Sequence, residues 1–532
     1  MARILIFHGY LLEGTGSNVY NARLAQTLAR LGHDVHLVCQ ERHPERLGFV
    51  DAAGDWDSGT LRVRRLREPA AGAGVGAEAG SCTVYRPDIG GLLPVYVADR
   101  YEAMEARTFS QLSDGELRRY LEANVDAVRE VAARAGPELA LANHLVMGPV
   151  ILARALGTGI PYAVKVHGSA LEYTVKPDPE RFLGVAREGL APAAAVLVGS
   201  RHTAESLWEA IADPGLPGRT RLGPPGVDVA RFRPRGKDEA IAGVADLADA
   251  LRHARELRPA GGESAFAREP RQAGDALARV RGGEPLVAFV GKLIVSKGPD
   301  LLLAAWPLVL ERLPCARLLI VGFGAYREGL EAMAGALRAG DLERVRELAL
   351  AGRALEGGGE AKAAPLGYLL AFLDSLDGPA AARYVAAAGE ICERALFTGR
   401  LEHDELPRLL PACSALVVPS TFPEAFGMVA AEAAACGALP ISAAHSGLAE
   451  VSETLAASVP APIRPLLSFD LGPGVVPAIA RRVLAWLECE PALQERTRDA
   501  LVATVRARWS WESVAEGVIA AARGELEVLP EP

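Results

Sequence analysis

Short apolar runs alternate with amphipathic stretches from the start of the chain. The first run is residues 3–7 (RILIF), and a second follows at residues 33–39 (HDVHLVC). Between them, Leu24, Leu28 and Leu31 fall at positions i, i+4 and i+7, which share one face of an α-helix. This order of strand, helix and strand predicts a βαβ unit at the N-terminus.

The same alternation continues in two series of predicted strands. The first series contains residues 138–144, 161–168 and 193–200, and the second contains residues 284–292, 316–322, 395–401, 415–420 and 438–444. Continuous aliphatic runs separated by amphipathic helices are typical of parallel sheets that are covered on both faces. We therefore predict an α/β protein with two doubly wound halves.

Breaks in this pattern suggest the domain limits. We predict an N-terminal domain at residues 1–232, a linker with a surface helix at residues 233–283, a C-terminal domain at residues 284–508, and a C-terminal helix at residues 509–532 that could pack back on the N-terminal domain. Helical pattern over about residues 326–394 separates two strands that a single helix would join in a minimal unit, so we predict a helical insertion. The Gly/Ala-rich residues 69–81 are predicted to form a loop.

Composition narrows the class of protein. A chain of 532 residues, 50% of them hydrophobic, is large enough for two cores. The net charge of −9, with both signs interspersed, disfavours nucleic acid or anionic lipid as the main partner. The seven cysteines form no CxxC pair or metal-binding spacing, and the N-terminus lacks the marks of a secretory leader. With no apolar stretch near the roughly twenty residues of a membrane span, we expect a cytoplasmic protein without a transmembrane segment.

The most informative stretch is residues 423–437, PEAFGMVAAEAAACG. After the predicted strand at residues 415–420, it reads as a loop that contains Glu424 and then as a helix that carries Glu432 on its second turn. The first turn of a helix presents unpaired N–H groups and partial positive charge, so its N-terminus is a site for a diphosphate. A carboxylate on each side could accept hydrogen bonds from the two sugars of a nucleotide-sugar. The alternative is a pair of glutamates that serve only the helix dipole and solvation.

This stretch, followed by LPISAAHSG, resembles the E-x7-E signature of the retaining glycosyltransferases of family 4, with Glu424 and Glu432 as its glutamates. Six further blocks agree in order, at residues 14–38, 224–234, 289–305, 318–324, 397–410 and 509–521. The resemblance implies the GT-B fold: two facing Rossmann-like, doubly wound domains, here with a helical insertion in the C-terminal domain. The second domain would hold most of the donor.

The resemblance also implies roles for single residues on the donor side. Glu432 would bind the ribose and Glu424 the transferred sugar. Lys297 matches the family's lysine, whereas Lys292 stands where the family usually has arginine, so a monodentate ammonium replaces a bidentate guanidinium. The donor-binding residues expected are Gly14, Gly16, Gly291, Phe426, Gly427, Met428, Val429 and Glu432. The lysines could instead be solvated, and Gly14 and Gly16 could form an ordinary turn.

In the N-terminal half, His167 matches a histidine that the family places near the transferred sugar, so we count it with Lys292, Lys297 and Glu424 as a candidate catalytic residue. A structural histidine beside a glycine is the alternative. Candidate acceptor residues are His144, Tyr96, Asp99 and Arg100, although the sequence around Tyr96, Asp99 and Arg100 favours an ordinary packed surface loop.

The function expected is transfer of a hexose, with retention, from a nucleoside-diphosphate sugar to a hydroxyl acceptor. UDP-hexoses such as UDP-glucose or UDP-GlcNAc are favoured as donors, and no metal or cofactor is expected. The partners are a nucleotide-sugar and a small or oligosaccharide-like acceptor, and the insertion could serve homo-oligomerisation. A GT-B sugar-nucleotide epimerase and a catalytically silent binding or scaffold protein are the alternatives.

The sequence DWD at residues 55–57 matches a metal-binding DxD motif, but its turn-rich surroundings predict a hairpin or loop.

Overall fold

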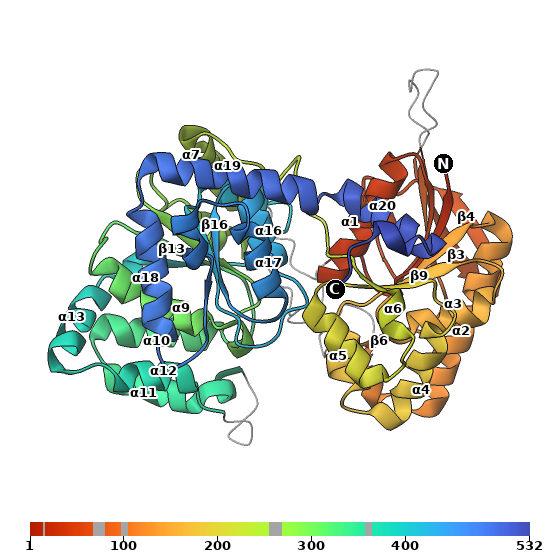
Figure 1. Ribbon diagram of the computed structural model, residues 1–532, viewed down its shortest axis with the longest axis horizontal. Helices are drawn as coiled ribbons and strands as arrows, with labels where there is room; N and C mark the ends of the chain where they lie inside the picture. Colours follow the sequence, from red (N-terminus) through yellow and green to blue (C-terminus); the bar gives the residue numbers. More distant parts are fainter. Residues whose placement is uncertain (14–15, 68–79, 97–104, 255–268, 357–363) are drawn as a thin grey trace. The chain divides into compact units, whose positions relative to one another are not determined.

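A computed structural model describes residues 1–13, 16–67, 80–96, 105–254, 269–356 and 364–532 (Figure 1). The chain divides into two compact units. The first unit is Met1–Gly226 with Trp509–Pro532, and the second is Val227–Arg508. The boundary thus falls at Gly226 rather than at residue 232, and the described part of the expected linker belongs to the second unit. Residues 509–532 lie in the first unit.

The first unit is built on a nine-stranded sheet. Its strands are β1 (Arg3–Phe7), β2 (Asp34–Val38), β3 (Ala52–Asp57), β4 (Thr60–Arg65), β5 (Ser81–Arg86), β8 (Leu139–Asn143), β9 (Tyr162–Lys165), β10 (Ala195–Val198) and β11 (Thr220–Leu222). Their order is β11-β10-β9-β8-β1-β2-β5-β3-β4, and all neighbours run parallel except the antiparallel pair β3 and β4. A separate parallel pair, β6 (Leu92–Val95) and β7 (Glu105–Thr108), lies apart from this sheet. The predicted strands of the first half are confirmed.

The hairpin of β3 and β4 accounts for the DWD sequence. The turn residues Ser58 and Gly59 have φ angles of 52° and 79°, as a tight two-residue hairpin turn requires. Asp55 forms a bidentate ion pair with Arg86 on β5, at 2.6 and 2.8 Å. The predicted hairpin is confirmed, and Asp55 has a structural partner.

Both faces of this sheet are buried, as β1 shows. Leu5 and Phe7 belong to one hydrophobic cluster, whereas Ile4 and Ile6 belong to the other. Helices α2 (Asp114–Ala135), α3 (Gly148–Leu156) and α4 (Pro179–Leu190) pack in sequence on the Leu5 side. Helices α1 (Gly16–Arg30) and α20 (Trp511–Arg523) pack together on the Ile4 side, where α20 also contacts β8 and β9 (Figure 1). The end of the chain is therefore part of this domain's core.

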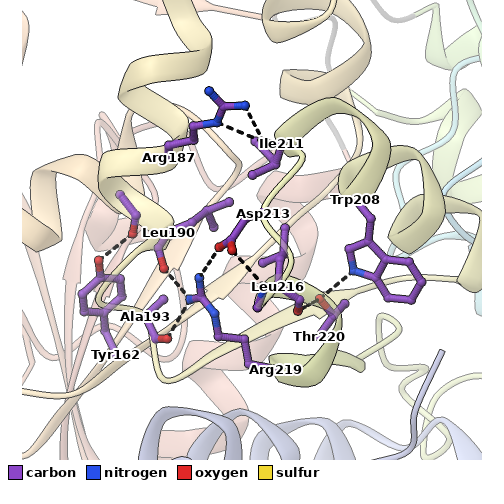
Figure 2. Close-up of polar contacts among 12 residues, drawn as sticks. Tyr162, Arg187, Leu190, Ala193, Trp208, Ile211, Asp213, Leu216, Arg219 and Thr220 are labelled. Atoms are coloured by element: carbon purple, nitrogen blue, oxygen red, sulfur yellow. Dashed lines mark hydrogen bonds and ion pairs between the residues drawn. The ribbon is translucent and has the colours of Figure 1, made fainter.

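A polar network fixes the edge of the sheet at β10 and β11, as Figure 2 shows. Arg219 donates hydrogen bonds to the carbonyls of Leu190 and Ala193 and forms an ion pair with Asp213 at 3.1 Å. Trp208, on α5 (Arg201–Ile211), donates to the Thr220 hydroxyl at 2.9 Å. These bonds satisfy carbonyls at the end of α4 and join the surrounding loops to the sheet.

The second unit has a six-stranded, all-parallel sheet. Its strands are β12 (Leu286–Val290), β13 (Arg317–Val321), β14 (Ala395–Gly399), β15 (Ala415–Val418), β16 (Leu439–Ala443) and β17 (Ser468–Phe469). The order β14-β13-β12-β15-β16-β17 is that of a Rossmann fold. Helices α9 (Pro299–Leu310) and α18 (Val475–Leu487) pack on each other, and α16 (Met428–Ala435), α17 (Ser446–Ala456) and α19 (Pro491–Arg508) form another group (Figure 1). The prediction of two doubly wound halves is confirmed.

The predicted helical insertion lies between β13 and β14 and is confirmed. It contains α10 (Arg327–Ala339), α11 (Leu342–Ala351), the 3-10 turn η5 (Gly352–Glu356), α12 (Gly367–Asp374), α13 (Gly378–Ala388) and α14 (Ile391–Arg394). By contrast, α7 (Lys237–Arg252) is more than the surface helix of a linker. It buries Val244, Leu247 and Leu251 and packs on α8 (Pro270–Leu277) and α15 (Leu406–Leu409).

The structure bears on the expectations for membrane spans, for the cysteines and for the loop at residues 69–81. Within the described ranges, no helix combines the length and the apolar character that crossing a membrane requires. The cysteines are free; Cys315 is exposed, whereas Cys39, Cys82, Cys413 and Cys436 are buried. Most of the predicted loop at residues 69–81 lies outside the described residues, and its last residue begins β5.

Candidate functional site

The candidate donor site lies at the switch point of the second sheet. β12 and β15 are neighbours, and the chain leaves them toward opposite edges of the sheet. In open α/β sheets, ligands bind outside the carboxyl ends of such a pair. Lys292 and Lys297 follow β12, and Glu424 follows β15. The fold thus brings the two predicted motifs to one place.

The segment that carries both lysines, residues 291–298, is here called the donor loop. It is held from two sides: Leu293 N–H donates to the Phe323 carbonyl at 2.7 Å, and Thr421 N–H donates to the Ser296 carbonyl at 2.9 Å. Its last turn is the 3-10 helix η4 (Val295–Lys297). The loop is therefore joined to the segments that follow both β13 and β15.

Lys297 and Glu424 form an ion pair across the switch point. Their side chains are 32% and 20% exposed, so the pair is shielded but open to solvent on one side. The same Glu424 oxygen accepts a hydrogen bond from the buried Ser420 hydroxyl at 2.5 Å. The lysine of one motif is thereby held by the first glutamate of the other.

A second set of bonds fixes the backbone of Glu424. Its N–H donates to the Ser446 hydroxyl oxygen at 2.9 Å, and its carbonyl accepts from Gly447 N–H at 2.9 Å. The His445 Nε2 atom lies 2.7 Å from the Ser420 carbonyl, which can only accept, so Nε2 carries the proton. Nδ1 of the same ring lies 3.0 Å from the Ser446 hydroxyl. Ser446 has a φ of 51°, an uncommon conformation that this network supports.

The second glutamate of the motif, Glu432, is buried on α16 and has a histidine partner. His403 Nε2 lies 2.6 Å from Glu432 Oε1, and the His403 ring packs on Phe232 with 5.2 Å between ring centroids. The glutamate side chain is only 3% exposed. Because a buried carboxylate needs a donor, His403 stabilises and orients Glu432.

The N-terminus of α16 is placed as predicted. The helix starts at Met428, after Gly427, with Glu424 before it and Glu432 on its second turn. No acidic residue occupies its first turn, so no side chain of that turn neutralises the partial positive charge there. Gly427 also has a packing role, because a Cβ there would lie 2.9 Å from the Leu448 side chain on α17.

Lys292 shares an aromatic neighbour with a second cation. Its Nζ lies 6.0 Å from the centroid of the Phe323 ring, and the Arg400 guanidinium lies 5.5 Å from it. Arg400 follows β14 and forms an ion pair with Glu402 at 3.1 Å. A planar guanidinium is thus present near the position where the family's arginine is replaced by Lys292.

In the first unit, three histidines follow adjacent strands: His8 after β1, His144 after β8 and His167 after β9. Ring centroids lie 5.8 Å apart for His8 and His144 and 4.8 Å apart for His144 and His167. Burial lowers the pKa of His8 to about 4. Burial, with repulsion among the basic groups, holds the pKa values of His144 and His167 well below their usual range. All three rings are therefore neutral near pH 7.

His167 has a defined tautomer. Its Nε2 lies 2.8 Å from Asn143 Oδ1, and the Asn143 amide donates to the Phe7 carbonyl at 3.2 Å, which fixes the orientation of the amide. Nε2 therefore carries the proton, and Nδ1 is an acceptor. Such an atom suits a sugar hydroxyl as its donor.

His144 is the unsatisfied member of this cluster. Both of its ring nitrogens are buried and have no hydrogen-bond partner among the described residues. Its φ of 68° is left-handed, and the Tyr96 ring lies 4.5 Å from its own. Tyr96 itself is buried and donates its hydroxyl to the Val146 carbonyl. Of the other predicted residues, Gly14, Asp99 and Arg100 lie outside the described ranges, and Gly16 begins α1.

Several residues of these networks were not predicted. Ser420, His403, His445 and Ser446 act through contacts that join distant loops. His403 lies in the block at residues 397–410, and His445 and Ser446 lie in the HSG sequence after β16, but none of the four was singled out as a site residue. Lys165, the last residue of β9, is a further residue that was not predicted. Its side chain is buried, and burial lowers the pKa of its ammonium group to about 7. The sequence did not predict a role for this lysine. Strand β9 is buried on both faces, so its pattern has no polar face on which a functional side chain would be expected.

Asp300 adds a pH-dependent element beside the donor loop. It lies in the first turn of α9, is 3% exposed, and has Oδ1 without a hydrogen-bond partner among the described residues. Burial, together with the charge of Glu356, raises the pKa of Asp300 from 3.8 to about 7. Between these values the folded protein keeps a proton that the unfolded chain releases. The contribution of Asp300 to stability is therefore full below pH 3.8 and is lost as pH rises through about 7.

We predict that Asp300→Asn, which cannot ionise, gains stability relative to the wild type as pH rises. The difference in free energy of unfolding between the two proteins should shift by roughly 2–3 kcal/mol between about pH 5 and about pH 8. Urea denaturation at both pH values measures it. Asp499→Asn, at an exposed position of α19, is the matched control and should show no such shift. A pH-independent difference for Asp300→Asn would contradict the prediction.

Comparison with known protein families identifies this architecture. The family described as "Glycosyl transferase 4-like domain" matches residues 15–215, and the family described as "Glycosyl transferases group 1" matches residues 369–457. Together these ranges cover more than half of the chain. The chain belongs to the family-4 glycosyltransferases. The first match covers most of the first unit, and the second covers Ser420, Glu424 and Glu432 in the donor site.

Known glycosyltransferases share parts of the sequence and the whole fold. D-inositol 3-phosphate glycosyltransferase from Mycobacteroides abscessus is 30% identical over 169 residues, which are 32% of this chain and 26% of that protein. The chain thus spans about a quarter of the length of this relative. Sucrose-phosphate synthase from Thermosynechococcus elongatus has a TM-score of 0.55 at 17% identity, covering 99% of this chain and 100% of that one. Anabaena HepE in complex with UDP and glucose has a TM-score of 0.55 at 16% identity, covering 98% and 100%. These likenesses show the GT-B fold.

Proposed function

We propose that the protein is a retaining glycosyltransferase that moves a hexose from a nucleoside-diphosphate sugar to a hydroxyl acceptor. The observation that carries the proposal is the Lys297–Glu424 ion pair at the switch point of the second unit, beside the N-terminus of α16. A cation, a carboxylate and a free helix N-terminus at one place match the parts of a nucleotide-sugar: a diphosphate and the hydroxyls of two sugars.

In the proposed reaction, the bond between the anomeric carbon and the diphosphate breaks, and the acceptor oxygen attaches on the same face. Negative charge develops on the leaving phosphate, where Lys297, Lys292 and the first turn of α16 stabilise it. The departing phosphate takes the proton of the acceptor hydroxyl, so no separate base is needed. A pair of glutamates acting as acid and base would be the competing chemistry, but Glu432 is held by His403 a helical turn behind the proposed phosphate site.

The second glutamate has a role in binding the donor. We propose that Glu432 accepts hydrogen bonds from the ribose hydroxyls and that Glu424 contacts the transferred sugar. The Anabaena HepE structure contains UDP and glucose, which supports a UDP-hexose such as UDP-glucose or UDP-GlcNAc as the donor here. We propose that the reaction takes place in the cytoplasm and needs no metal, so addition of EDTA should leave the rate unchanged.

The histidines of the first unit are the proposed contacts for the other reactant groups. His167 Nδ1 can accept a hydrogen bond from a sugar hydroxyl, and His144 offers one donor and one acceptor to a hydroxylated molecule, with Tyr96 beside it. One relative is named for inositol phosphate and one structural neighbour for sucrose phosphate, so polyhydroxylated acceptors are the first to screen.

We predict that one family of nucleotides, UDP first among UDP, GDP and ADP, raises the melting temperature of the wild type, because a ligand of the native state stabilises it by mass action. At about one hundred times its Kd, the ligand adds roughly 2.7 kcal/mol of stability. In Glu432→Gln the shift should be lost or need at least about tenfold more ligand, because the ribose contact is weakened. Glu453→Ala, at an exposed position of α17, is the control.

The outcomes of this thermal-shift series separate the alternatives. No shift with any nucleotide at millimolar concentration would contradict the transferase and favour the silent scaffold protein. A shift in the wild type and an equal shift in Glu432→Gln would place the nucleotide elsewhere. A sugar-nucleotide epimerase would convert the bound donor without any acceptor, which product analysis detects.

A further inference from the structure

The helical insertion contacts the donor loop directly. The Val295 N–H donates a hydrogen bond of 2.7 Å to the Glu356 carboxylate. Val295 is the first residue of η4, and Lys297 is the last residue of the same turn. A carboxylate that accepts from the first N–H of a helical turn caps it, in a charge-assisted bond that is stronger than a neutral one. The turn that carries Lys297 is thus bonded to a residue of the helical insertion.

Glu356 belongs to a 3-10 turn whose first residues pack closely on neighbouring backbone. It ends η5, and at the start of η5 the Arg353 N–H donates to the Ala364 carbonyl at 3.2 Å. Gly352 has a φ of 51°, and a Cβ there would lie 2.0 Å from the Ala364 carbonyl oxygen, so only glycine allows this approach. The start of the 3-10 turn that ends at Glu356 is therefore fixed by backbone contacts.

Two buried acidic side chains, Asp300 and Tyr326, lie near this contact. Asp300 lies next to it in the first turn of α9, and Tyr326 is buried beside both carboxyl groups. Burial, together with the charge of Glu356, raises the pKa of Asp300 to about 7.

We propose that Glu356 is a positioning residue for the donor: it caps η4 and so holds Lys297 where the leaving phosphate binds. This inference rests on the proposed function of the donor site. A Rossmann fold needs only one helix between the second and third strands of this sheet, whereas here the insertion supplies the capping carboxylate. The insertion is then a working part of the donor site.

Two substitutions remove the two halves of the contact. Glu356→Ala removes the acceptor, whereas Glu356→Gln keeps an oxygen that can accept. Val295→Pro removes the N–H and replaces the valine side chain by the proline ring. We expect the backbone to accept it, because Ile294 is extended at φ −136° and ψ 152° and proline suits the first position of a helical turn. Glu347→Ala, at an exposed position of α11, is the control in the same insertion.

The experiment measures the Kd of UDP by calorimetry, with GDP and ADP in parallel, and amide hydrogen exchange of the peptide that contains residues 291–298. We expect Glu356→Ala to weaken binding about tenfold and to speed exchange in this peptide, at an unchanged melting temperature without ligand. Glu356→Gln should stay within about threefold of the wild type, and Glu347→Ala should equal it. In the Val295→Pro background, Glu356→Ala should have no further effect on the Kd.

Two results overturn the proposal. If Glu356→Ala binds the nucleotide as the wild type does, Glu356 does not position the loop, and the proposed function stands. If Glu356→Ala weakens binding equally with and without the Val295→Pro substitution, the effect does not pass through the cap. A wild type that binds none of the three nucleotides overturns the proposed function itself, a distinct outcome.

Discussion

Replacing Lys297 by alanine should lower kcat by about 10²- to 10³-fold, which is the usual cost of removing one group that stabilises charge in a transition state. The leaving diphosphate gains negative charge as the glycosidic bond breaks, and Lys297 is the lysine that the structure brings to Glu424 at the switch point. Because the interaction strengthens as the reaction proceeds, kcat should fall more than KM rises. Steady-state rates of nucleotide release measure both.

The control for this loss is Lys237→Ala, which removes the same charge from an exposed position at the start of α7. It should keep the wild-type rate. If Lys297→Ala retained kcat within about threefold, the lysine would serve only as a structural partner of Glu424, a contribution that is small for a partly exposed ion pair.

A double-mutant cycle with Glu424 separates the two roles of the pair. If Glu424 acted only by holding Lys297, Glu424→Ala would cost nothing further in the Lys297→Ala background. We expect an additional loss of at least about tenfold, because the proposed contact of Glu424 with the transferred sugar does not depend on the lysine. The Ser420 hydroxyl also bonds to this carboxylate and keeps it in place in the variant.

The parallel strands were predictable because a strand buried on both faces is a continuous apolar run. β1, β8, β12 and β15 all read this way, and each lies within its predicted range. The strands that were missed are those with weaker patterns. β5 has the mixed polar and apolar sequence SCTVYR and begins at the last residue of the predicted loop at residues 69–81, and β17 has only the two residues Ser468–Phe469, so neither makes a recognisable run.

The site was predictable only where one local motif carried it. Glu424 and Glu432 lie in one short segment whose spacing is readable, and Lys297 follows a strand that is readable as well. His403 bonds to Glu432 across 29 residues, and Glu356 bonds to Val295 across 61. Such contacts depend on how loops from different strands meet at the end of the sheet. No local pattern encodes them.

The second large effect should follow from adding one methyl group to the donor loop, in Gly298→Ala. Gly298 ends η4 and precedes α9, with a φ of 65° that costs alanine about 1–2 kcal/mol. A Cβ there would lie 2.1 Å from the Pro419 carbonyl oxygen, and neither the Cβ nor this backbone oxygen can rotate away. Overpacking adds roughly 1–3 kcal/mol, so the expected loss is about 4 kcal/mol and the melting temperature should fall by roughly 10 °C.

Gly335→Ala is the matched test of this reasoning, because it adds the same methyl group in the same unit. Gly335 is exposed within α10 and has nothing within 4 Å of its Cβ position, so alanine should stabilise the protein by about 0.5–1 kcal/mol. Urea denaturation should therefore move the two variants in opposite directions. Pro419 directly precedes Ser420, so the displaced loop in Gly298→Ala should also separate Lys297 from Glu424 and weaken nucleotide binding. A Gly298→Ala protein with wild-type stability would mean that the donor loop is not held against the end of β15, and the switch-point site would lose its geometric basis.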